Sequence, residues 1–409
     1  MEVIYSRCCG LDVHKKTVVA CLRVGSKKEI RSFGTTTEQL RAMATWLDEA
    51  ECTQVAMEST GVYWKPVVNV LELSGMDYSV VNARHMKAVP GRKTDVNDAE
   101  WLCDLTRHGL VRASFIPDRQ RRELQELVRY RRSLINDRTR EVNRIHKLLE
   151  GANIKLTSVV TDVMGVSGRA MLQTLARGET DPMVLAQLAN THIKAPPAQI
   201  RNAVDGFMGK HQRKLLVTQL SHIDLLNRKI AGLDKEVDTR LRSSGDIVAR
   251  LKTIPGIGKA SAQELIAAIG TDMSRFPSAA HLASWAKVCP GANESAGKRK
   301  PARTGRGNPF LRSTLIEAAQ SAARTKDTYL RSQYYRIKAR RGANKATVAV
   351  AHSILTMVYH IIKDETSYLE LGADYFDRQR PQALSRQLVH RLTKMGFTVT
   401  IEPATKPAA

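Results

Sequence analysis

Short apolar runs alternate with helix-like segments over about the first hundred residues. The stretch "RCCGLDVHKKTVVACLRV" has two apolar runs joined by a polar turn around His14 to Lys16, which predicts a β-hairpin. The runs "TQVAMEST" and "DYSVVNA" read as strands, and a segment with helical periodicity follows each of them. This order predicts an α/β domain over residues 1–117, in which helices cover a mixed sheet.

Apolar positions at helical spacing dominate residues 118–250. The segment "DRQRRELQELVRYRRSLINDRTREVNRIHKLLEG" has no proline, and no glycine before its last residue, so it predicts one long, arginine-rich amphipathic helix. The segment "QRKLLVTQLSHIDLLNRKIAGLDKEVDTRLRSS" has the same pattern. Together they predict either an antiparallel helical hairpin or an oligomeric coiled coil.

A compact helical domain is predicted for residues 251–372. It begins with "LKTIPGIGKASAQELIAAIG", continues through a basic loop that contains glycine, and returns to helix. Residues 373–409 read as a basic helix with a polar, partly disordered end. The expected fold class is therefore α/β followed by α.

The charge balance indicates a polyanionic partner. The chain has 64 Lys and Arg against 40 Asp and Glu, a formal net charge of +24, and nucleic acid is the first partner to consider. The six cysteines form no CxxC pair, so they favour reduced thiols in a cytoplasmic protein over a zinc site or a disulfide framework. We expect neither a signal peptide nor a membrane span.

Two aspartates, Asp95 and Asp98, lie three positions apart directly after Arg92 and Lys93. On a helix they would share one face and repel each other, unless a metal ion, a basic side chain or water lay between them. Taken alone, Asp95 also fits the cap of the following helix, and Asp98 fits an ion pair with Arg92 or Lys93.

Two more acids end predicted strands, Asp12 in "GLDVHKK" and Glu58 in "AMESTG". Because the carboxyl ends of parallel strands meet at one edge of a sheet, these acids are expected to converge. With Asp95 and Asp98 they make four carboxylates, a set that suits one or two Mg²⁺ ions on a phosphodiester. Taken alone, Asp12 also fits a turn residue, and "GLDVHKK" resembles the phosphate-binding hairpin of sugar-kinase-like folds.

The segment "TIPGIGKASA" predicts a helix-hairpin-helix that binds DNA without reading its sequence. Gly256 and Gly258 would let the backbone approach a phosphate, and the amides near Lys259 would contact it. An ordinary tight turn is the alternative. Arg131 and Arg138 of the arginine-rich helix are further predicted nucleic-acid contacts.

Ser295 directly precedes the basic loop. It is either a nucleophile or a hydrogen-bond donor to a phosphate, although serine in such loops is common for structural reasons. No histidine base is next to it, so a nearby carboxylate or a metal-bound group would have to activate it. The cations of the loop, which would stabilise charge on a phosphate, are Lys298, Arg299, Lys300, Arg303 and Arg306.

Five segments in this order, "GLDVHK", "MESTGVYW", "KTDVNDAE", "IPGIGKASA" and "GKRKPARTGRGNPFLR", resemble the DEDD-type transposases of the bacterial insertion-sequence one-ten family. The resemblance covers roughly residues 5–365. It implies a RuvC-like, ribonuclease-H-type N-terminal domain, a coiled-coil middle and a C-terminal transposase domain. The family acids would be Asp12, Glu58, Asp95 and Asp98 with Mg²⁺.

The resemblance further implies a serine nucleophile that forms a phosphoserine intermediate, in a site shared with the acids of another subunit. Ser295 matches by position. A glycine-rich run often follows this serine in the family, whereas here Ala296 comes before Gly297. The alternative serines are Ser261, Ser284 and Ser313.

The partners implied are double-stranded DNA of the element ends and target, a structured guide RNA from the non-coding end of the element, and other copies of the chain, as dimers that pair into tetramers. The expected location is the bacterial cytoplasm, at the nucleoid. Two other functions stay open from the residues themselves. One is a metal-dependent junction resolvase or nuclease that uses water, and the other is a non-catalytic nucleic-acid-binding scaffold.

Overall fold

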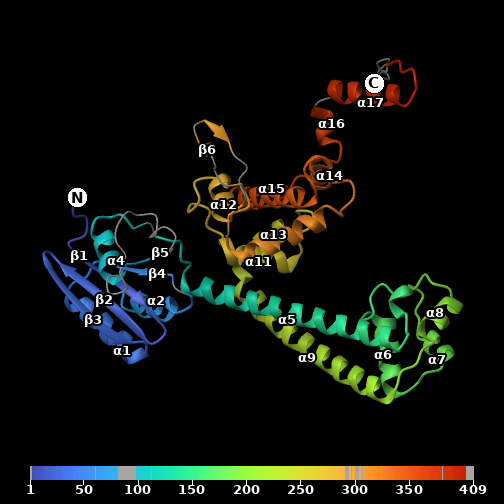
Figure 1. Ribbon diagram of the computed structural model, residues 1–409, viewed down its shortest axis with the longest axis horizontal. Helices are drawn as coiled ribbons and strands as arrows, with labels where there is room; N and C mark the ends of the chain where they lie inside the picture. The colour runs from blue at the N-terminus through green and yellow to red at the C-terminus, as the bar shows by residue number, and fades with distance from the viewer. Residues whose placement is uncertain are drawn as a thin grey trace. The chain divides into compact units, whose positions relative to one another are not determined.

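The computed structural model of the chain describes residues 2–59, 61–81, 98–111, 113–290, 294–295, 297–299, 304–305, 307–379 and 381–401 (Figure 1). The chain divides into two compact units, Met1–Gln120 and Arg121–Ala409. The predicted boundary at Pro117 lies close to this division. The boundaries predicted at residues 250 and 372 fall inside the second unit and stay predictions.

The N-terminal unit is built on a five-stranded mixed sheet of order β3-β2-β1-β4-β5. β1 to β3 form an antiparallel meander, and β4 and β5 continue the sheet in parallel with β1. The predicted hairpin, the two later strands and the mixed sheet are confirmed. The strands are β1 (Arg7–Val13), β2 (Thr17–Val24), β3 (Lys27–Gly34), β4 (Gln54–Glu58) and β5 (Tyr78–Val81).

Helices cover both faces of this sheet. α1 (Thr37–Glu49) and α2 (Trp64–Leu73) pack with the strands around one apolar core, to which the strands contribute Leu11 and Met57. α4 (Asp98–Arg107) lies on the other face, where Gly10 allows it to approach closely: a Cβ at Gly10 would lie 2.3 Å from the carbonyl oxygen of Ala99. This close contact fixes where the first turn of α4 lies along β1.

Two long helices dominate the second unit, α5 (Arg119–Gly151) and α9 (Lys210–Arg240), and both were predicted. They run antiparallel, since ion pairs join Glu123 to Arg240 at 3.0 Å and, further along, Glu141 to His222 at 3.4 Å (Figure 1). The chain therefore forms the predicted antiparallel hairpin by itself. Whether it also forms an oligomeric coiled coil stays a prediction.

The segment between α5 and α9 forms its own small core. Its elements are η2 (Leu156–Ser158), α6 (Val166–Arg177), α7 (Pro182–Gln187) and α8 (Pro197–Val204). Their apolar side chains pack against the ends of the long helices, where Leu149 and Leu216 are buried in the same cluster. This packing caps the far end of the hairpin.

The C-terminal region contains η3 (Arg242–Ser244), α10 (Gly245–Leu251), α11 (Lys259–Ile269), α12 (Ala279–Trp285), β6 (Glu294–Ser295), β7 (Lys298–Arg299), α13 (Pro309–Ala322), α14 (Tyr329–Arg341), α15 (Ala343–Lys363), α16 (Tyr375–Gln379) and α17 (Pro381–Lys394). Of these, α10 to α15 share one core with the first turns of α5, where Leu124 and Val128 are buried. In the described residues, α15 alone is long and apolar enough to span a membrane, and more than half of its apolar window is buried in this core.

Candidate active site

Asp12 and Glu58 end neighbouring parallel strands. β1 and β4 pair in a register that sets Leu11 beside Met57, so the next position along each strand sets Asp12 beside Glu58. Side chains two residues apart on a strand point to the same face. Gly10 contacts α4, and Ala56 is buried in a cluster with Leu102 of α4, so both acids point toward the face that carries this helix.

Asp98 lies at the first position of α4, which runs antiparallel to β1. The Cys103 Sγ lies 3.8 Å from the Cys8 Sγ, and Ala99, nearer the start of the helix, lies against Gly10. The N-terminal end of α4 is therefore directed toward the carboxyl end of β1. Ion pairs from Arg23 to Asp104 (2.8 Å) and from Lys28 to Glu100 (3.0 Å) hold the helix on the sheet.

Three of the four predicted acids therefore lie on one face and toward one edge of the sheet, supplied by β1, β4 and α4. The fourth, Asp95, lies outside the described residues, as do Arg92 and Lys93. Carboxylate oxygens are the ligands that Mg²⁺ prefers, so the chemistry of this donor set fits the ion. Over the described ranges, no three His, Cys, Asp or Glu side chains already form a group that could hold a metal.

Asp12 has a neighbour that sequence reasoning missed. Its Oδ2 lies 2.9 Å from Nε2 of the exposed His14. The spacing "DVH" was the available signal, since residues i and i+2 of a strand share a face. A cation held by Asp12 would compete with His14 for this oxygen.

Three buried thiols lie beneath α4. The thiol of Cys103 contacts Cys8 and Cys21, and hydrogen bonding from it lowers the pKa of both. The same contacts, together with burial, raise the pKa of Cys103. All six cysteines of the chain are in the described residues and are free thiols. Cys8 is in β1 and Cys21 in β2, so these contacts pack α4 against the antiparallel part of the sheet, where β1 carries Asp12.

The segment predicted as a helix-hairpin-helix forms two helices, α10 and α11, joined by a turn over residues 252–258. Its two glycines have different surroundings. Gly256 has φ +90°, and a Cβ there would lie 2.3 Å from the carbonyl oxygen of Ala318 in α13. Gly258 has φ −91°, and a Cβ there would meet nothing within 4 Å. Gly256 is therefore required for packing, whereas the backbone at Gly258 is open to a ligand.

Gly256→Ala is expected to lower the free energy of unfolding by about 2–4 kcal/mol, because the methyl group meets backbone and the left-handed conformation disfavours alanine. Gly258→Ala should leave stability within about 0.5 kcal/mol and weaken DNA binding, since the added methyl lies where a phosphate would approach. Urea unfolding of the full chain and a DNA-binding titration measure the two effects. Equal destabilisation by both changes would contradict this division of roles.

Arg131, predicted to contact nucleic acid, is buried. Its side chain is 1% exposed, and it donates hydrogen bonds to Asp234 of α9 at 3.0 Å and to Gln263 of α11 at 2.6 Å. A guanidinium in this position cannot reach a nucleic acid, so this prediction is corrected to a structural role. Arg131 ties α5 to both helices.

A second arginine of α5 has a similar role. Arg132 pairs with Glu264 at 2.5 Å and also with Glu317, and Glu264 accepts a hydrogen bond from Thr314 at 2.7 Å. Burial raises the pKa of Glu264 although these partners oppose the rise. Of the nine arginines between Arg119 and Arg144, at least four pair with acids of this chain. A substantial part of the arginine-rich sequence of α5 therefore serves internal contacts.

Arg131→Met is expected to lower the free energy of unfolding by about 2–4 kcal/mol, because Gln263 would lose a buried partner. Arg140→Met, on the same helix, is the matched control. Its exposed pair with Asp137 should contribute less than about 1 kcal/mol. Urea unfolding of both variants tests this, and equal stabilities would overturn the structural role of Arg131.

The remaining predicted contacts are placed as follows. Arg138 is half-buried on α5, and Lys259 begins α11, where its ammonium lies 2.6 Å from Asp238. Of the alternative serines, Ser284 is exposed on α12, Ser261 is half-buried on α11, and the Ser313 hydroxyl donates to the carbonyl of Phe310.

Ser295 is in β6, where its backbone pairs with Lys298 of β7. Arg299 pairs in the same two-stranded ribbon, with Glu294. The other predicted loop cations, Lys300, Arg303 and Arg306, lie outside the described residues. The nucleophile prediction for Ser295 therefore rests on the sequence.

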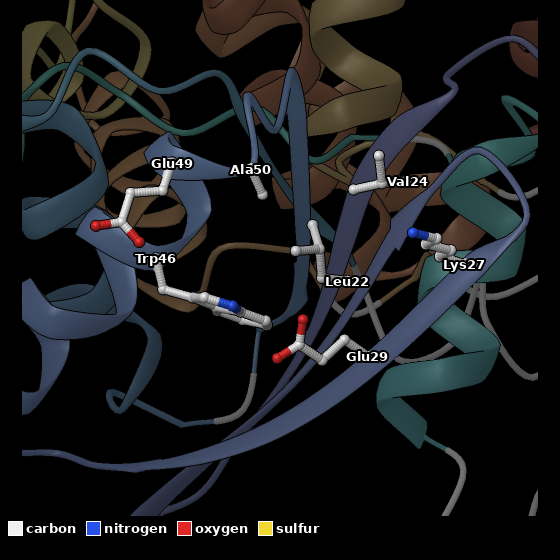
Figure 2. A pocket seen from close by; sticks show the side chains of 7 residues that line it. All are labelled: Leu22, Val24, Lys27, Glu29, Trp46, Glu49 and Ala50. Atoms are coloured by element: carbon white, nitrogen blue, oxygen red, sulfur yellow. The ribbon is translucent and has the colours of Figure 1, made fainter.

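A small pocket of about 260 Å³ lies between α1 and the first strands (Figure 2). Leu22 and Trp46 form its apolar lining, and Glu29 and Glu49 lie at its sides. Leu22 and Trp46 belong to the core on the α1 side of the sheet, so this pocket is on the face opposite the acids. Glu49, which lines this pocket, can therefore serve as a control residue in experiments on the acid site.

Family models match two parts of the chain. One described as "Transposase" matches residues 9–154, and one described as "Transposase IS116/IS110/IS902 family" matches residues 248–336. A "Probable family 20 transposase" of Pseudomonas aeruginosa is 26% identical over 367 residues, which cover 88% of this chain and 94% of that protein. The "Transposase for insertion sequence element IS1111A" of Coxiella burnetii is 24% identical over 305 residues, which cover 72% of this chain and 73% of that protein.

Proposed function

Since this chain belongs to the IS116/IS110/IS902 family of transposases, enzymes that act in the transposition of insertion sequences, we propose that it cuts and rejoins DNA with an acid cluster and a serine nucleophile. The observation that carries the proposal is the placement of Asp12, Glu58 and Asp98 on one face and toward one edge of the sheet. The strand order β3-β2-β1-β4-β5 supports a ribonuclease-H-type, RuvC-like domain.

Asp12, Glu58 and Asp98, with Asp95, would hold Mg²⁺. The bound ion would supply charge stabilisation for the attacking and leaving oxygens of a phosphodiester. The described acids come from three different elements of one compact unit, so the fold itself keeps their backbones at this edge. Rigid placement of this kind reduces the reorganisation that the reaction requires.

The nucleophile in this proposal is Ser295. Its Oγ would bond to the phosphorus, the bond from phosphorus to the leaving deoxyribose oxygen would break, and the hydroxyl proton would pass to a nearby carboxylate while the leaving oxygen takes up a proton. The product is a phosphoserine intermediate, which a deoxyribose hydroxyl of the second DNA resolves by the reverse exchange. Because bond energy is kept in the intermediate, rejoining needs no external energy source.

Two partners complete the proposal. A structured RNA from the non-coding end of the element would select donor and target DNA, and dimers would pair into tetramers so that Ser295 of one subunit meets the acids of another. The formal charge of +24 supports nucleic-acid partners of either kind.

A denaturing gel separates this proposal from hydrolysis by a junction resolvase. The full chain is incubated with Mg²⁺, end-labelled duplex DNA that carries the ends of its element, and a transcript of the non-coding end. The proposal expects part of the label to shift to the size of a protein–DNA adduct and to return after protease treatment. Cleaved DNA without any adduct would instead indicate water as the nucleophile.

A further inference from the structure

A strip of basic side chains lies on α14 and the start of α15. We call Arg336, Lys338, Arg340, Arg341 and Lys345 the α14 strip. All five are exposed. The sequence has no Asp or Glu between Asp327 and Asp364, and none of the five pairs with a carboxylate in the part of the chain that the structure describes. These cations are therefore available to an external anion.

Packing in the core does not explain why the positions of the α14 strip are basic. Leu330 is the one buried residue among the thirteen of α14, so most of the helix surface is not used in the core. The helix dipole accounts for part of the charge, because cations in a last turn are stabilised, and Lys338, Arg340 and Arg341 lie there. It does not account for Lys345, which is in the first turn of α15, where a cation is unfavourable.

Two of the cations line a pocket of about 330 Å³. Arg336 and Arg340 are one helical turn apart and face it together with the amides of Gln333 and Gln379. Phe376 of α16 closes one side, and the Arg336 guanidinium lies 4.8 Å from its ring centroid. The Gln333 amide already donates to the Ser353 hydroxyl at 2.9 Å, so the two guanidinium groups, with Gln379, would supply the donors for the oxygens of a phosphate.

Most aromatic rings near the strip pack against other side chains of the chain, and Tyr335, at 48% exposed, is the exception among the described residues there. Arg331 and Lys338 lie 5.2 and 5.5 Å from the ring of Tyr335. The ring of Phe376 is stacked against Tyr329 at 5.3 Å in addition to its contact with Arg336. Proteins that bind single strands offer open rings to successive bases. The strip offers five exposed cations but, in its described surroundings, one exposed ring and no series of open rings, which suits a phosphate backbone better than a row of unpaired bases.

We propose that the α14 strip is a docking surface for the phosphate backbone of double-stranded DNA. It would hold the duplex independently of its sequence, because it presents cations and no groups arranged to read base edges. This inference rests on the proposed function, in which DNA is the substrate. It adds a DNA-binding surface that lies mostly outside the second family match, because that match ends at residue 336. The strip positions DNA and takes no part in the chemistry.

The test compares duplex binding by two triple variants of the full chain, both of which carry Glu58→Gln so that no cleavage disturbs the titration. The first adds Arg336→Gln and Arg340→Gln. The second, a control with the same change of charge, adds Arg7→Gln and Arg240→Gln, since Arg7 and Arg240 already pair with acids of the chain. Fluorescence anisotropy with a labelled duplex gives Kd over a series of salt concentrations.

The strip variant should bind the duplex about 10- to 100-fold more weakly than the control, and the slope of log Kd against log salt should fall by about 1.8, or about 0.9 for each lost phosphate contact. Equal slopes and affinities for the two variants would overturn the proposal. Single-stranded DNA and an RNA duplex of the same sequence are titrated in parallel, and a loss confined to either of them would also overturn it. Because binding is read without cleavage, failure of the serine mechanism leaves this result unaffected.

Discussion

Replacing Glu58 by glutamine is expected to reduce the rate of Mg²⁺-dependent DNA cleavage by about 1000-fold or more. Glu58 ends β4 beside Asp12 and points to the face that carries α4, so the change removes one negative charge from the edge where the acids converge. Glutamine keeps the size of the side chain but is a much weaker ligand for a hard cation. Single-turnover cleavage of end-labelled DNA measures the rate.

The matched control is Glu49→Gln, the same substitution in the same unit. Glu49 lies beside the pocket on the opposite face of the sheet (Figure 2). The Glu49→Gln variant should cleave DNA at a rate within about twofold of that of the unmodified chain. Circular dichroism should show that both variants are folded. If Glu58→Gln retained most of the activity, or if both variants lost it equally, the acid site would be wrongly assigned.

Ser295→Ala is expected to remove the covalent protein–DNA adduct completely and to lower strand exchange to background. The reason is chemical, since alanine has no oxygen that can bond to phosphorus. Denaturing gels and mass spectrometry of the protease-treated adduct provide the readout. Duplex binding by this variant should be unchanged, which separates loss of the nucleophile from loss of the substrate.

Ser284→Ala serves as the comparison. Ser284 is exposed on α12 and is an alternative nucleophile from the sequence, so the two variants test the assignment directly. We expect Ser284→Ala to form the adduct at the normal level. An adduct that survives Ser295→Ala but is lost in Ser284→Ala would move the nucleophile to α12.

The elements that the sequence predicted are those with a strong periodic signal. β1, β2, α5 and α9 combine regular apolar spacing with clear ends, so their existence and type followed from the pattern. β3 was not predicted, because its sequence "KKEIRSFG" is mostly polar and exposed at the sheet edge and therefore lacks a core-facing pattern. The short helices between α5 and α9 were not predicted either, because none of them has a long run of apolar residues at helical spacing.

The prediction that Arg131 contacts nucleic acid was wrong because the partners of a side chain can lie far away in the sequence. An arginine-rich helix predicts either a nucleic-acid surface or internal ion pairs, and composition alone does not separate them. Arg131 is buried because Asp234 and Gln263 come to it from positions more than 100 residues away. The placement of Asp12 and Glu58, by contrast, could be predicted, because each acid lies at the carboxyl end of a strand with a clear apolar pattern.

For the contact between His14 and Asp12, the positions of the two residues could be predicted but their pairing could not. Their spacing places them on one face, but no pattern in the residues indicates that they contact each other rather than lie apart in solvent. Asp95 and the side chain of Ser295 lie outside what the structure describes, so their roles stay predictions.

The central claim is that Asp12, Glu58 and Asp98 together form a site for a divalent cation. Titration of the full chain with Mn²⁺, followed by electron paramagnetic resonance of the free ion, measures this without any activity assay. The account predicts saturable binding by the unmodified chain and by Glu49→Gln, and at least about tenfold weaker binding by Asp12→Asn and by Glu58→Gln. Equal Mn²⁺ binding by all four proteins would contradict it.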